Sequence, residues 1–113
     1  MQKIRYVLLG LITAFHASAV IAQQLDVEIK VMKGDGQAAI CGSSRVEGLN
    51  PNGDGFLAVR TGPGSKYRKI DQIYNGDIVA DCNQRGKWHG IFYGPNNKKK
   101  GWVHGNWLVW VAG

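Results

Sequence analysis

Hydrophobic and polar residues alternate along the first part of the chain. Leucine, valine and isoleucine take every second position of residues 25–31, and charged residues stand between them. A period of two places the apolar side chains on one face of a strand. We therefore expect an N-terminal strand and linker over residues 23–36, and the apolar run of residues 37–41 could return beside it.

Five further apolar runs follow at close spacing, at residues 56–59, 70–74, 78–82, 88–93 and 101–104. Turn-forming residues separate them: Gly62-Pro63-Gly64, the hairpin signal Asn75-Gly76, and polar segments rich in Gly and Asn. Strands at this spacing without a helical period predict an all-β fold. We expect a small barrel of about five to seven short antiparallel strands.

Residues 42–55 are rich in Gly, Ser and Asn, which predicts a loop. Within it, residues 50–55 have oxygen-bearing side chains at alternate positions and glycine at the sixth, like the start of a calcium loop. Such a loop needs a carboxylate at its twelfth position, where this chain has Thr61. We interpret the segment as a connection that uses Asn and Asp for local backbone hydrogen bonds. The apolar pair Trp110 and Val111 has no predicted partner.

Four segments carry a further pattern: residues 57–64 (Leu-Ala-Val-Arg-Thr-Gly-Pro-Gly), 75–77 (Asn-Gly-Asp), 86–88 (Gly-Lys-Trp) and 101–103 (Gly-Trp-Val), the last followed by Trp107-Leu108. In this order they resemble the bacterial SH3-like domain family. The resemblance implies such a domain over residues 37–110, closed by a single turn at residues 105–108. The chain departs from the family in having Ala58 where Asn is common and a longer loop at residues 42–55. It also lacks the acidic, tyrosine-rich opening with which eukaryotic SH3 domains bind Pro-rich peptides.

A groove between the loop after the first strand and the loop of the central hairpin is the expected binding site of such a small barrel. Aromatic faces beside cations suit peptides, glycans or a protein partner with carboxylates. The candidate ligand-binding residues are Arg60, Tyr67, Arg68, Tyr74, Trp88, Trp102 and Trp107. Trp88 and Trp102 are alternatively core residues, because large aromatic side chains dominate burial in a small domain.

Charged residues near this groove also have simpler interpretations. Arg60 could pair with Asp71 or Asp77 and hold the turn. Residues 98–100, three consecutive lysines, are expected at a solvated hairpin tip. They could instead contact an anionic surface or guard a sheet edge.

The first 22 residues have the pattern of a secretory signal peptide. Lys3 and Arg5 precede ten apolar residues, 6–15, and small residues then offer cleavage sites, of which we favour the one after Ala22. Residues 6–15 are too short for a membrane span, so none is expected after cleavage, although an uncleaved anchor is the alternative. Cleavage removes two positive charges and lowers the formal net charge from +6 to +4. A basic exported protein is expected to meet cell-wall polymers, head groups or acidic proteins rather than nucleic acid.

Cys41 and Cys82 are the two cysteines of the chain. In a small exported domain such a pair is expected to be bridged. No enzyme or cofactor is expected: the cysteines are assigned to a disulfide, and no paired carboxylates suit sugar hydrolysis. His89 and His104 could lie on neighbouring strands, but a zinc site needs at least three protein ligands and no third is evident. We therefore expect no metal.

Three functions remain open on these grounds. The first is an exported, periplasmic or secreted, non-catalytic binding module that recognises peptidoglycan, such as its stem peptides, or an envelope protein. The second is a periplasmic inhibitor or immunity-type protein that binds a toxin or hydrolase. The third is a small enzyme or metal protein. The sequence does not predict the oligomeric state.

Overall fold

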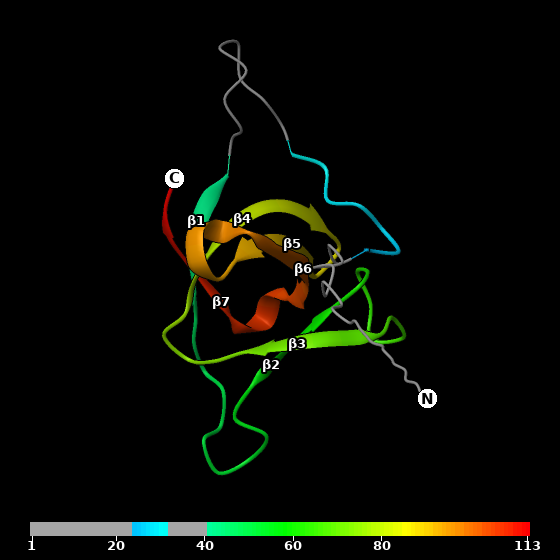
Figure 1. Ribbon diagram of the computed structural model, residues 1–113. Helices are drawn as coiled ribbons and strands as arrows, with labels where there is room; N and C mark the ends of the chain where they lie inside the picture. The colour runs from blue at the N-terminus through cyan, green and yellow to red at the C-terminus, as the bar shows by residue number, and fades with distance from the viewer. Residues whose placement is uncertain (1–23, 32–40) are drawn as a thin grey trace, which may run out of the picture.

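The computed structural model describes residues 24–31 and 41–113, and within them seven short strands form one antiparallel sheet (Figure 1). The predicted signal peptide and the run 37–40 lie outside the described residues. The strands are β1 (Gly42–Val46), β2 (Leu57–Arg60), β3 (Lys69–Ile73), β4 (Ile78–Arg85), β5 (Trp88–Tyr93), β6 (Lys99–His104) and β7 (Leu108–Ala112). Single 3₁₀ turns, η1 (Pro95–Asn97) and η2 (Gly105–Trp107), flank β6, and η2 confirms the predicted turn after that strand.

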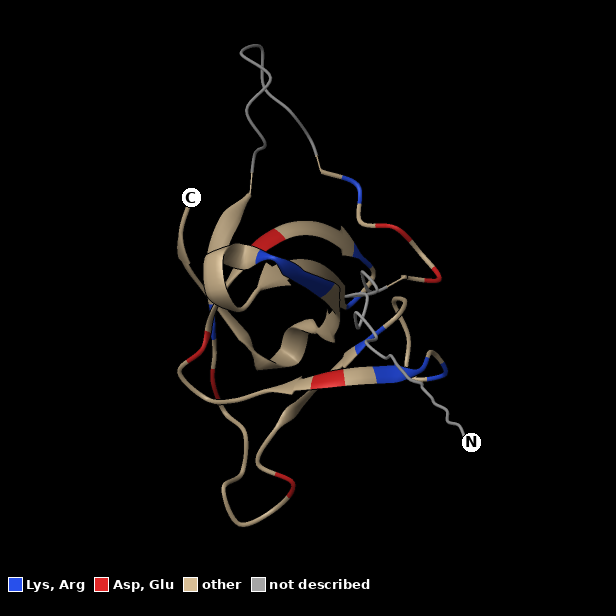
Figure 2. Ribbon diagram, viewed as in Figure 1, with Lys and Arg blue, Asp and Glu red and all other residues tan. Residues whose placement is uncertain are grey.

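The order of strands in the sheet is β3-β2-β6-β5-β4-β1-β7. The predicted all-β class and strand number are confirmed, but the sheet does not close into a barrel, because β3 and β7 remain as its edges. Figure 1 shows the strands curling around a shared interior. Charged positions of both signs are spread over the strands and loops (Figure 2).

The core comes from the inward positions of the strands. Its main cluster is formed by aliphatic side chains and one tyrosine, namely Val46, Leu49, Leu57, Val59, Ile73, Val79, Ile91, Tyr93 and Val103. Trp102 and Ile29 are buried outside this cluster. In β2 the two core side chains alternate with Ala58 and Arg60, as the period of two predicts. Gly101 of β6 packs directly against Val59, so the sheet can bend tightly there.

The Asn75-Gly76 turn forms, but the strands on either side of it do not pair, so the predicted hairpin is wrong. The turn is bound to the chain around β1 instead. Asn75 exchanges two hydrogen bonds of 3.0 Å with the backbone of Leu49, and the N–H of Gly76 donates to the carbonyl of Val46 at 2.8 Å. These bonds direct the chain away from β3 to β4, which lies between β5 and β1 in the sheet.

The predicted loop of residues 42–55 contains a strand, β1, which pairs with β4 on one side and β7 on the other. Ser44 is buried in this strand, and its hydroxyl is satisfied there by donating to the Asp81 carboxylate at 2.8 Å. The apolar tail that the sequence left without a partner is β7. The loop interpretation holds for residues 50–55, where the N–H of Asn52 donates to Asn50 Oδ1 at 2.9 Å.

Residues 24–31 form no strand, contrary to expectation. Their burial nevertheless alternates, with Ile29 buried and its charged neighbours exposed. The backbone N–H groups of Asp26 and Val27 both donate to the carbonyl of Thr61, at 2.9 and 3.1 Å. Because both donors bond to the same carbonyl, they do not form the regular hydrogen-bond ladder of a paired strand. The segment therefore lies along the sheet without becoming one of its strands.

The predicted disulfide between Cys41 and Cys82 is present and joins the start of β1 to β4. Its Cα atoms are 4.3 Å apart and it closes a loop of 41 residues. Two of the three consecutive lysines are not simply solvated: Lys99 lies 3.5 Å from the Asp71 carboxylate, and Lys100 lies 3.2 Å from that of Glu28.

Candidate functional site

A hollow of about 380 Å³ lies between β2, the start of β3, the start of β5 and the turn η2. We name it the aromatic hollow. Three aromatic side chains, one histidine and three charged groups contribute to its lining: Phe56, Trp88, Trp107, His104, Arg60, Lys69 and Asp54. The two cations outnumber the single carboxylate, so the hollow favours an anionic group.

The aromatic rings are positioned by the pairing of β5 with β6 and by the turn that follows. Trp88 pairs with His104 across the two strands, and their rings meet edge to face with centroids 5.1 Å apart. His104 Nδ1 accepts the N–H of Asn106 at 3.1 Å, which caps η2 and places the next residue, Trp107. The Trp107 ring lies over Gly48 and keeps 38% of the residue's surface exposed. A partly exposed indole beside a fixed one is a surface on which an apolar or ring-shaped group can pack.

The two cations are held at the same hollow by different contacts. Lys69 Nζ lies 4.3 Å from the centroid of the Phe56 ring and donates to Gln72 Oε1 at 2.8 Å. Arg60 Nη1 donates to the carbonyl of Tyr67 at 2.9 Å. The predicted pairing of Arg60 with Asp71 or Asp77 is therefore wrong. Because Arg60 uses Nη1 on a neutral carbonyl, its positive charge is not neutralised there and can act on a ligand carboxylate.

Of the seven predicted ligand-binding residues, three line the aromatic hollow: Arg60, Trp88 and Trp107. Trp102 is fully buried, so it is a core residue. Tyr74 lines a separate hollow. Tyr67 is half-buried over Gly62, and Arg68 is exposed and lines neither hollow.

Sequence reasoning missed Phe56, Lys69 and His104. The alternation of β2 held the signal for the first of these. Since Leu57 and Val59 are buried in the core, Phe56 belongs with Ala58 and Arg60 on the opposite side of the strand. All three line the aromatic hollow, which also reaches Leu57. Lys69 and His104 lie at the ends of strands that approach the hollow only because of the sheet order, which the sequence does not give.

No family model, curated protein or solved structure matches the chain. The chemistry of its own residues is therefore the basis for a functional assignment. No helix within residues 24–31 and 41–113 is long and apolar enough to cross a membrane.

A second polar cluster lies beside the disulfide. His89 Nδ1 lies 2.8 Å from Asp81 Oδ1, and the other oxygen of this buried carboxylate accepts the Ser44 hydroxyl. The hydroxyl thus contacts the carboxylate rather than the imidazole, so the three lack the nucleophile–base contact of a catalytic triad.

His89 and His104 lie on the neighbouring strands β5 and β6, as predicted. In the described part of the chain, no group of three or more His, Cys, Asp or Glu side chains is placed to hold a metal ion.

Proposed function

We propose that the protein is an exported, non-catalytic binding module of the cell envelope. Its aromatic hollow would recognise the peptide part of peptidoglycan. The observation that carries this proposal is the meeting of three aromatic rings with the cations Arg60 and Lys69 in one hollow. Stem peptides combine short apolar side chains with free carboxylates. The rings offer packing surface for the former, and the cations attract the latter.

Two further observations support export. The pattern of residues 1–22 is that of a signal peptide. The Cys41–Cys82 disulfide fits an oxidising compartment, since such bonds are rare where thiols are kept reduced. The resemblance of residues 37–110 to bacterial SH3-like domains agrees with a binding role, because that family contributes modules of this kind to cell-wall proteins.

Capture on purified sacculi tests the proposal. The processed protein, with its disulfide intact, is incubated with sacculi at physiological salt beside an unrelated basic protein of similar charge. We expect saturable retention of this protein and none of the control. Equal retention of both proteins would reduce the interaction to non-specific charge attraction and contradict the proposal.

An exposed apolar surface favours a second candidate function, that of a periplasmic inhibitor or immunity-type protein. Ile78, the first residue of β4, and Val109 of the edge strand β7 both pair with Arg45 of β1, so they lie exposed on one face of the sheet. Neighbouring exposed apolar side chains of this kind commonly mark contacts between proteins. Capture of one envelope protein in stoichiometric amounts, with sacculi left empty, would favour this candidate over wall binding. The Val109→Ala variant should then bind the captured protein more weakly.

A further inference from the structure

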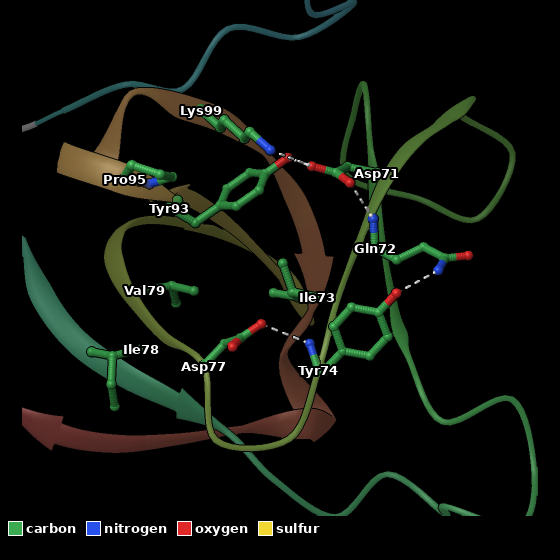
Figure 3. A pocket seen from close by; sticks show the side chains of 11 residues that line it. Asp71, Gln72, Ile73, Tyr74, Asp77, Ile78, Val79, Tyr93, Pro95 and Lys99 are labelled. Atoms are coloured by element: carbon green, nitrogen blue, oxygen red, sulfur yellow. Dashed lines mark hydrogen bonds and ion pairs between the residues drawn. The ribbon is translucent and has the colours of Figure 1, made fainter.

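A second hollow of about 420 Å³ lies between the edge strand β3, the start of β4 and the chain that leads from the end of β5 to the start of β6 (Figure 3). We name it the acidic hollow. In Figure 3, Asp71 and Lys99 lie on one side of it with Tyr93, and Asp77 and Tyr74 lie on the other. Ile73 and Val79 lie between the two groups and are buried. The hollow thus has an apolar floor and a charged rim, which is the usual composition of a binding site.

The two carboxylates are fixed by the backbone of the edge strand. Asp71 Oδ1 accepts the N–H of Gln72 at 2.8 Å, and Asp77 Oδ2 accepts the N–H of Tyr74 at the same distance. These donors are two residues apart and therefore point in the same direction from the chain. Because an aspartate carboxylate already accepts each of these N–H groups, a further strand cannot bond to them at this edge. A ligand of the hollow is therefore expected to bind through a side chain and not through its backbone.

Asp71 is also bound from the core side of the hollow. Its Oδ2 accepts the Tyr93 hydroxyl at 2.9 Å. Burial raises the pKa of Asp71. The Gln72 N–H, the Tyr93 hydroxyl and Lys99 together lower this pKa by more than burial raises it, so the pKa lies below its usual value. The carboxylate is therefore ionised at neutral pH. Two carboxylates face one ammonium group, so the rim carries a net negative charge on an otherwise basic protein.

The chain places one of its own cations at this rim. The stem of Lys99 runs against Gly94, and its ammonium group lies 3.5 Å from Asp71 Oδ2 and 6.0 Å from the centroid of the Tyr93 ring. Both contacts are at the long end of their ranges, and half of the Lys99 side chain stays exposed. The position of Lys99 shows that the rim accommodates a cationic group. Because its contacts are weak, another cation can displace the Lys99 ammonium.

We propose that the acidic hollow binds an arginine side chain from a basic segment of a partner protein. The planar guanidinium would replace the Lys99 ammonium at the Asp71 carboxylate, because its paired donors match a carboxylate better than a single ammonium does. Asp77 is exposed, and within the described residues no group bonds its Oδ1, so this oxygen is available to the incoming cation. The Tyr74 ring, half exposed beside it, covers the aliphatic stem of the arginine.

Amide resonances of the processed protein test this proposal directly. The probe is the capped tripeptide Gly-Arg-Gly, and the control replaces arginine by citrulline, which has nearly the same shape but no charge. The N–H groups of Gln72 and Tyr74 report on the two carboxylates because each donates to one of them. We expect saturable shifts of both resonances with a Kd of about 1 mM for the arginine peptide and none for the citrulline peptide.

Two variants give opposite expected results. Asp77→Asn should weaken binding of the arginine peptide about two- to fivefold, because a rim carboxylate is lost. Lys99→Gln should strengthen binding by a similar factor, because the competing ammonium is removed. Trp107→Ala, in the aromatic hollow, should leave the affinity unchanged, so failure here is distinguishable from failure of wall binding.

Equal shifts with the citrulline peptide, or weaker binding by Lys99→Gln, would overturn the proposal. Tighter binding of spermidine than of the peptide would also overturn it, since the preferred ligand of the hollow would then be a free polyamine.

Discussion

The indole nitrogen of Trp102 donates a hydrogen bond of 2.8 Å to the carbonyl oxygen of Val27, across 75 residues of sequence. Trp102 is fully buried in β6, whereas residues 24–31 form no strand. The bond therefore anchors the N-terminal segment to the centre of the sheet. The ring nitrogen explains why this buried position suits tryptophan better than another large apolar residue.

Replacing Trp102 by phenylalanine should lower the free energy of unfolding by about 1–3 kcal/mol, because the Val27 carbonyl loses its donor and some packing is lost. The amides of Asp26 and Val27, which both donate to Thr61, should exchange with solvent faster. Denaturant unfolding and hydrogen exchange measure the two effects. Unchanged exchange at both amides would mean that Trp102 does not anchor the segment. Trp110→Phe, at an exposed indole, is the matched control.

Gly101 has no room for a side chain. A Cβ atom there would overlap the Val59 side chain and lie 3.2 Å from the carbonyl oxygen of Arg60. Gly101→Ala should therefore cost about 1–3 kcal/mol of stability, as overpacking of a core does. Gly53→Ala, where the nearest atoms are 3.6 Å away, should change stability by less than about 0.5 kcal/mol. Urea midpoints that shift equally for both variants would contradict this account of β6.

The disulfide restricts the unfolded chain over a loop of 41 residues. The double variant Cys41→Ser, Cys82→Ser should lose about 3–4 kcal/mol of stability in the chain-entropy model. Reduction of the wild-type protein should produce a similar loss, measured by thermal unfolding with and without reductant. A wild-type protein whose stability is insensitive to reductant would show that the bridge contributes little.

The stabilising effect of Asp71 should depend on pH. Because its folded pKa is below its unfolded pKa, the contribution is present above the unfolded value and is lost as pH falls through the folded one. The stability difference between wild type and Asp71→Asn should be constant near neutrality and shrink below about pH 4. Chemical unfolding from pH 7 down to pH 2 measures the difference. A difference that stays constant over this range would contradict the assignment.

Much of the sheet could be predicted from the sequence because turn residues separate short apolar runs, and in β2 the alternation also agrees with burial. In β4 it does not, because Val79 and Asp81 are buried whereas Ile78 is exposed. β1 could not be predicted, since the sequence Gly-Ser-Ser-Arg-Val is polar for a strand. Its burial depends on Asp81, 37 residues away, which accepts the Ser44 hydroxyl. The segment 25–31 shows the opposite case. Its alternation agrees with its alternating burial, yet its backbone bonds to the Thr61 carbonyl and to the Asn83 side chain instead of pairing with a strand.

The sequence named some of the residues that line the aromatic hollow and missed others. Arg60, Trp88 and Trp107 come from segments that meet at the aromatic hollow. Tyr74 does not join them because the chain after β3 turns away toward β4 instead of forming a hairpin. The direction of that turn depends on hydrogen bonds to the chain around β1, and that strand was itself not predicted.

The central claim is that the aromatic hollow is the wall-binding site, and two exposed tryptophans allow a direct test. Trp107 lines the hollow, whereas Trp110 lies outside it on β7. The measurement is the affinity for purified sacculi of the wild type, Trp107→Ala and Trp110→Ala at physiological salt. The account predicts at least a tenfold loss of affinity for Trp107→Ala, as for an aromatic anchor, and wild-type affinity for Trp110→Ala. Equal affinities of all three proteins, or a loss confined to Trp110→Ala, would contradict it.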